Sequence, residues 1–219
     1  IAGIAAVLAW KTRRPVKLRL PRDDDMRITG KRHPFLFRYD VGFDDDGRIL
    51  ALDMTLAANG GNVADHTPAV VTRALCHADN CYWLPAVAIH SYRCRTNTVS
   101  NTAFRGFGGP QGMFAIEGVI DAIARALGRD PLDVRRANLY GTTERNVTPY
   151  TMTIEDNVAP QIIDALEASS GYRARRRAIE RWNRDNEVLK RGIALTPVKF
   201  GISFTASHYN QAGALVHLY

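Results

Sequence analysis

The segment FRGFGGPQG, residues 104–112, places an arginine among four glycines. Glycines leave backbone N–H groups free to approach an anion, and a helix that begins behind them points its positive dipole end at the same place. Arg105 adds a guanidinium suited to two-pronged contacts with an oxyanion. Phe104 and Phe107 flank it, which is unusual for a plain turn. The segment predicts an anion-binding loop, with a simple glycine-rich entry into a helix as the equal alternative.

This loop matches neither of the two common phosphate-binding motifs. It lacks the Gly-Lys-Ser/Thr ending of a P-loop, and its spacing differs from that of the dinucleotide fingerprint. The segment KFGISFT, residues 199–205, also carries a glycine between aromatic residues. Taken alone, it is more typical of a buried strand with one close contact.

A second group of reactive side chains is Cys76, His77 and Cys81. Their spacing matches no common zinc pattern, and Cys94 is distant in sequence. Buried thiols beside a structural histidine are the better interpretation. Three cysteines are also too few for a disulfide framework, which favours a reducing, cytoplasmic compartment.

The charge and hydropathy patterns exclude two classes of partner. Four arginines within 173–177 supply more than half of the net charge of +7, and we interpret them as a solvated helix face. Basic motifs with interleaved stacking aromatics are absent, so we expect no nucleic-acid partner. The opening apolar run of ten residues is half of what a membrane span needs, so no membrane partner is expected.

The order of the elements that position these residues, strands then helices then strands, predicts an α+β fold with mixed sheets and packed helices. Alternating or β-rich segments predict strands, and the turn Asp44–Gly47 favours a hairpin between two of them. Gly128 as C-cap and Asp130 as N-cap bound two helices. The predicted strands are 15–20, 35–43, 49–57, 86–96, 193–206 and 211–219, and the predicted helices are 1–10, 68–78, 113–127, 130–140, 159–169 and 172–187. Because both chain ends fall inside apolar segments, we also expect a segment of a longer polypeptide.

Across nearly its whole length the chain resembles the molybdenum hydroxylase family, and within it the molybdenum-binding subunits of the xanthine dehydrogenases. The stretch SNTAFRGFGGPQG at 100–112 carries the resemblance most strongly. Five further runs agree in order: ITGKRHPF at 28–35, RALCHADNCY at 73–82, RRANLY at 135–140, PVKFGISFT at 197–205 and NQAGALVHLY at 210–219.

The resemblance implies a hydroxylation of hypoxanthine and xanthine toward urate at a molybdopterin-bound molybdenum. Electrons would leave through 2Fe-2S clusters and FAD to NAD, carried by other regions or subunits of an oligomeric parent enzyme. It implies that Arg105 holds the molybdopterin near the metal, with the backbone of Phe104 and Gly106. Residues 1–141 would be the later part of one molybdopterin-binding domain, 142–157 a linker, and 158–219 the start of a second.

The resemblance also assigns the substrate contacts. Phe107 and Phe204 match two rings that hold the purine, Thr205 matches a hydrogen-bonding neighbour, and Arg73 matches an arginine facing the purine oxygen. An arginine there is typical of the purine enzymes and not of aldehyde oxidases. No acid of this chain, Glu117 included, matches the catalytic glutamate. The open alternatives are a hydroxylase of aldehydes or nicotinate-like heterocycles, and a non-catalytic piece as the chain stands.

Overall fold

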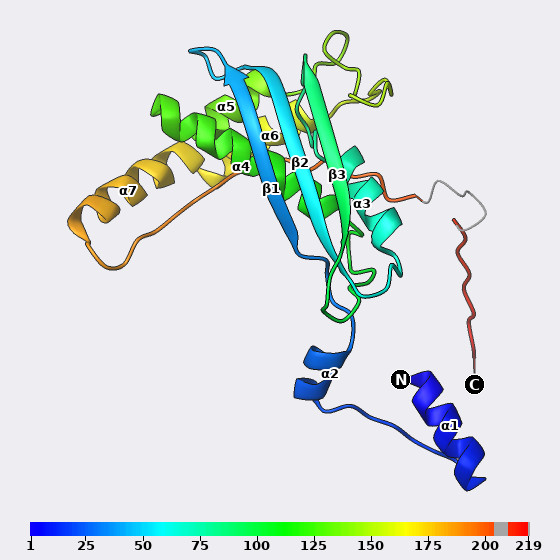
Figure 1. Ribbon diagram of the computed structural model, residues 1–219. Helices are drawn as coiled ribbons and strands as arrows, with labels where there is room; N and C mark the ends of the chain where they lie inside the picture. The colour runs from blue at the N-terminus through cyan, green and yellow to red at the C-terminus, as the bar shows by residue number, and fades with distance from the viewer. Residues whose placement is uncertain (204–209, 219) are drawn as a thin grey trace.

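The computed structural model describes residues 1–203 and 210–218, and a three-stranded mixed sheet lies at its centre (Figure 1). Strand β1 (Phe35–Phe43) is antiparallel to β2 (Ile49–Gly61), which is parallel to β3 (Val87–Arg95). The hairpin turn is confirmed, because the backbone N–H of Arg48 donates to Asp44 Oδ1 at 2.8 Å. The α+β class predicted from the sequence is likewise confirmed.

Three helices lie on one face of this sheet (Figure 1). Helix α3 (Thr67–Cys76) connects β2 to β3, and α4 (Gly109–Leu127) and α5 (Pro131–Asn138) follow β3. Both predicted caps are present: Gly128 ends α4 in the left-handed conformation, and the side chain of Asp130 accepts a hydrogen bond from the backbone N–H of Leu132. The order of elements therefore follows the sequence pattern closely in this region.

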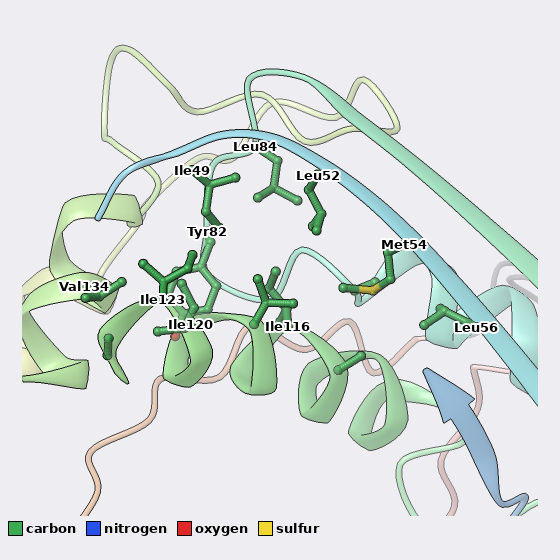
Figure 2. Close-up of a cluster of buried hydrophobic side chains, with 14 of the residues drawn as sticks. Ile49, Leu52, Met54, Leu56, Tyr82, Leu84, Ile116, Ile120, Ile123 and Val134 are labelled. Carbon is green, nitrogen blue, oxygen red and sulfur yellow. The ribbon is translucent and has the colours of Figure 1, made fainter. Parts of the chain in front are cut away.

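The main core is formed between the inner face of β2 and one side of α4 (Figure 2). Alternate residues of the strand meet helix residues spaced by three and four positions, as the periodicities of the two elements require. Removing this apolar surface from water is the main favourable contribution to the stability of the fold. The central side chains are Leu52, Met54, Leu56, Ile116, Ile120 and Ile123, all almost fully buried.

Helices α6 (Ala159–Ser170) and α7 (Tyr172–Asp185) form a second, smaller cluster against α5. Leu132, Ile163, Tyr172 and Leu195 are buried there. The prediction of a solvated arginine face on α7 is partly wrong. Arg175 and Arg177 are exposed. Arg173 and Arg176 instead pair with Asp130 at 3.2 and 2.9 Å, and so connect α7 to the start of α5.

Three predicted strands are absent from the described part of the chain. Residues 15–20 are largely exposed and lie between α1 (Ala2–Thr12) and α2 (Arg22–Ile28), away from the sheet (Figure 1). Residues 193–203 and 210–218 have no regular secondary structure. Alternation alone could not make strands of these segments, because no neighbouring strand offers them hydrogen-bonding partners. Helix α2 was missed, although three aspartates in its first turn are a helix-start signal.

The close contact between α3 and α4 depends on glycine. A Cβ atom on Gly108 would lie 2.0 Å from the backbone oxygen of Val70, and one on Gly112 would lie 2.2 Å from that of Ala74. Both neighbours are backbone atoms, which cannot move aside as a flexible side chain would. Any larger residue at either position must therefore push the two helices apart.

We expect Gly112→Ala to destabilise the chain by about 2 kcal/mol, because overpacking a tight contact typically costs 1–3 kcal/mol. Gly118 is the matched control on the same helix, since a Cβ there would meet nothing within 4 Å. Gly118→Ala should stabilise the protein by up to about 1 kcal/mol through helix propensity. Urea unfolding followed by circular dichroism measures both. Equal stability of the two variants would contradict the close helix contact.

Candidate functional site

The glycine-rich loop before α4 turns through three consecutive residues with positive φ. The angles are 89° at Gly106, 49° at Phe107 and 103° at Gly108. A non-glycine residue in this region is strained by about 1 kcal/mol or more, and such strain concentrates at functional sites. The turn is fixed by a hydrogen bond of 2.7 Å from the N–H of Phe107 to the carbonyl of Phe104. The backbone of this loop is therefore held in a defined conformation.

The loop offers unpaired positive and N–H groups at the surface. Arg105 is exposed, and neither its guanidinium nor its backbone N–H has a partner among residues 1–203 and 210–218. Within the same ranges, the backbone N–H of Gly106 also has no acceptor. These donors suit a ligand that carries oxyanion groups. The geometry is consistent with the anion-binding interpretation of the loop, which stays a prediction.

Arg32 supports this loop from behind. Its guanidinium donates to the backbone carbonyl of Arg105 at 2.7 Å and lies 4.5 Å from the centre of the Phe104 ring. Both contacts hold the loop backbone while leaving the Arg105 side chain free. Our sequence reasoning did not single out Arg32, although it lies within the ITGKRHPF segment.

Arg73 and Phe107 lie side by side at the end of α3. The guanidinium carbon of Arg73 is 5.9 Å from the centre of the Phe107 ring and 5.5 Å from that of Phe200. The ring of His66 meets Phe107 edge-on, with centroids 5.9 Å apart. The structure thus brings together an arginine and an aromatic ring that are 34 positions apart in sequence.

The segment 197–203 runs along the end of α3 and the turn that follows it, and its alternate residues form hydrogen bonds to both. Asn80 accepts from the N–H of Lys199 at 3.0 Å and donates to the carbonyl of Pro197 at 2.9 Å. The Arg73 guanidinium donates to the carbonyls of Gly201 and Ser203. The predicted site residues Phe204 and Thr205 come next in sequence and lie outside the described residues.

Phe200 fixes this segment against the glycine-rich loop, and sequence reasoning did not assign it a role. A Cβ on Gly109 would lie 2.2 Å from the Phe200 ring, so the ring rests directly on the first residue of α4. Gly109 and Phe200 both belong to motifs that stand out in the sequence, but only the fold shows that they touch.

Glu117 has a structural role in this fold. The guanidinium of Arg135, almost fully buried, lies 2.8 Å from its carboxylate, and Tyr82 donates to the same carboxylate at 2.6 Å. Burial, together with the adjacent Glu117 charge, raises the pKa of the Tyr82 hydroxyl well above its usual value. A carboxylate held in this way is not available to accept a substrate proton.

The cysteines do not join a metal cluster in the described part of the chain. Burial raises the pKa of the Cys81 thiol to about 12, which keeps it protonated. Cys76 is half-buried, and His77 is buried with its pKa lowered, mainly by loss of hydration. The histidine is therefore neutral near pH 7 and bonds to backbone groups on both sides.

None of the helices within the described ranges is long and apolar enough to cross a membrane. The candidate site consists of the exposed glycine-rich loop, the adjoining Arg73 and Phe107, and the segment 197–203, which contacts Arg73 and Gly109.

Comparison with known proteins shows which class of protein this is. The molybdopterin cofactor-binding domain family matches residues 1–139, and a second model of the same description matches residues 165–219. The chain belongs to the molybdopterin cofactor-binding domain family.

Individual relatives narrow this class. The chain is 49% identical over 219 residues to a xanthine dehydrogenase/oxidase of Gallus gallus, and 47% identical over 221 residues to a nicotinate hydroxylase of Emericella nidulans. Each match covers 100% of this chain and 16% of the relative. Among solved structures, the aldehyde oxidoreductase of Desulfovibrio gigas matches with a TM-score of 0.72 and 30% identity, over 84% of this chain and 20% of that one.

These relatives define an oxidoreductase fold that houses a molybdenum cofactor, as the sequence resemblance predicted. The chain spans about one sixth of the length of the curated relatives. It therefore carries a part of their molybdopterin-binding region.

Proposed function

We propose that this chain contributes the purine-binding side of a molybdenum hydroxylase that converts hypoxanthine and xanthine toward urate. The bound molybdenum cofactor supplies the two-electron oxidation. The residues of this chain bind the cofactor, orient the purine and stabilise charge on it. The observation that carries the proposal is the nearness of Arg73 to Phe107, beside a loop whose Arg105 guanidinium has no partner within residues 1–203 and 210–218.

Arg73 has the capacity for a substrate contact. A guanidinium carries five N–H donors, and the two carbonyls of Gly201 and Ser203 use two of them. The other donors have no partner in the described part of the chain, and we propose that they bind a purine oxygen. Attack at a ring carbon builds negative charge on that oxygen, and a fixed cation stabilises the charge more in the transition state than in the ground state.

Phe107 would orient the substrate, and the loop would hold the cofactor. A flat heterocycle packed against a phenylalanine ring is restrained to a few orientations, which favours attack at one carbon. Arg105, with the backbone of Phe104 and Gly106, would bind the molybdopterin close to the metal without coordinating it. Phe204 and Thr205 complete the proposed substrate contacts by family resemblance alone.

The remaining parts of the proposal concern the parent enzyme. Its iron–sulfur clusters, FAD and NAD site would lie in other regions or subunits, and the parent would be an oligomer. We retain the division into residues 1–141, a linker at 142–157 and a second domain from 158. Three free cysteines favour a reducing, cytoplasmic setting.

A related hydroxylase with another substrate is the second candidate. The nicotinate hydroxylase is nearly as similar to this chain as the xanthine dehydrogenase/oxidase, so overall identity does not decide the substrate. The structural neighbour from Desulfovibrio gigas is named as an aldehyde oxidoreductase. Arg73 is the feature that favours a purine, because an aldehyde has no second oxygen for it to bind.

In the full-length parent enzyme, Arg73→Met should lower kcat/KM for xanthine by roughly 10²–10³-fold, the usual effect of losing one donor to a developing oxyanion. Turnover of an aldehyde such as benzaldehyde should change less than about threefold, since that substrate does not need the guanidinium. Arg38→Met, on the exposed face of β1, is the matched control. An equal loss on both substrates would rule out the role given to Arg73.

The third candidate is that the 219-residue chain by itself is a non-catalytic binding piece. We expect the purified chain to hold well under one molybdenum per molecule. The relatives are about six times as long as this chain, and we expect part of the cofactor's contacts to come from the regions that this chain does not cover. Metal analysis by mass spectrometry measures this. A ratio near one would show that this segment alone retains the cofactor.

A further inference from the structure

A closed ring of hydrogen bonds links Arg73, His77 and Gly201. The backbone carbonyl of Arg73 lies 2.8 Å from His77 Nδ1, and the N–H of Gly201 lies 3.0 Å from His77 Nε2. The carbonyl of Gly201 in turn accepts from the Arg73 guanidinium. The ring therefore leaves the Arg73 backbone, passes through the imidazole and the backbone of Gly201 from its N–H to its carbonyl, and returns to the Arg73 side chain.

The ring fixes the tautomer of His77. A carbonyl can only accept, so Nδ1 must carry the proton, and a backbone N–H can only donate, so Nε2 must be bare. His77 is 8% exposed, which favours this neutral form. A protonated imidazole would present an N–H to the N–H of Gly201 and open the ring.

The imidazole also holds Gly201 by packing. Its ring centre lies 5.0 Å from that of Phe200, the residue before Gly201, and Phe200 rests on Gly109. Gly201 is therefore fixed from one side by the ring of its neighbour and from the other by the bond to Nε2. Its carbonyl direction, which the Arg73 side chain follows, is set by both.

We infer that His77 is a positioning residue for Arg73, holding the Gly201 carbonyl so that the guanidinium faces the substrate side of the site. The inference deepens the proposed purine function and rests on it for the identity of the substrate. The contacts of His77 are to the Arg73 and Gly201 backbones and the Phe200 ring, so we place it behind the proposed substrate contacts. It acts through Gly201. Its substitution should therefore lower turnover only of substrates that bind to Arg73.

Two substitutions separate the hydrogen bond from the packing. His77→Phe keeps an aromatic ring against Phe200 and removes the acceptor for Gly201. His77→Gln loses the ring and keeps an acceptor near the position of Nε2. Both are made in the full-length holoenzyme, and His90→Phe on the exposed side of β3 is the matched control.

We expect His77→Phe to lower kcat/KM for xanthine about tenfold, the size of effect expected from one lost neutral hydrogen bond. His77→Gln should recover most of this activity, and His90→Phe should match the wild type. Benzaldehyde turnover and molybdenum content should stay constant in all three. In an Arg73→Met background, His77→Phe should lower kcat/KM for xanthine less than twofold further, because the group it positions is already gone.

The opposite results decide against the inference. Losses that add fully in the double variant, or fall equally on xanthine and benzaldehyde, would show that His77 is merely structural. A wild type without purine turnover would instead overturn the proposed function. Hydrogen exchange of the peptide 197–203 separates these failures, since His77→Phe should speed it and His77→Gln should not. Equal exchange in wild type and His77→Phe would overturn the hydrogen-bonded ring itself.

Discussion

The approach of α4 to α3 through Gly108 and Gly112 is the constraint on which the site depends. Arg73 lies in the last turn of α3, and Phe107 lies just before α4 begins. Only where the two helix backbones nearly touch can these side chains meet. The same contact brings the free Arg105 to this end of the helix pair. Because Gly108 and Gly112 have no side chains, the two helices can pack closely, and this packing sets the positions of Arg73 and Arg105.

Some charged side chains of the chain stabilise the fold, and others lie at the candidate site. Acidic groups near the core are neutralised locally: Glu117 by Arg135, and Asp79 by Lys199 with a hydrogen bond of 2.7 Å from Tyr140. Removing one partner of such a buried pair leaves an unpaired charge and destabilises the fold by about 3–5 kcal/mol. These groups therefore have a structural role. Arg105, by contrast, has no acidic partner within residues 1–203 and 210–218. An excess of positive charge at this loop is what an anionic cofactor requires.

Local signals predicted well those parts of the structure that depend on neighbouring residues. The Asp44–Gly47 turn, the Gly128 and Asp130 caps and the helix behind the glycine-rich loop all follow from short-range chemistry. The strand predicted at 193–206 is absent over its described part, residues 193–203, where the hydrogen-bonding partners are the side chains of Arg73, His77 and Asn80 and not another strand. The ring through His77 and Gly201 joins positions 124 apart, and no pattern in the sequence indicates it. Family resemblance named Arg73 and Phe107 as separate substrate contacts, and the fold shows that they lie close together.

The claim that Arg73 and Phe107 form the purine-binding face is tested most directly by a crystal structure of the full-length holoenzyme with a bound purine inhibitor. We predict that a purine oxygen lies within about 3 Å of the Arg73 guanidinium, a normal charge-assisted hydrogen bond. The purine ring should pack against Phe107 while the bond from Gly201 to His77 persists. A purine bound away from Arg73, with the guanidinium still directed only at Gly201 and Ser203, would contradict the account.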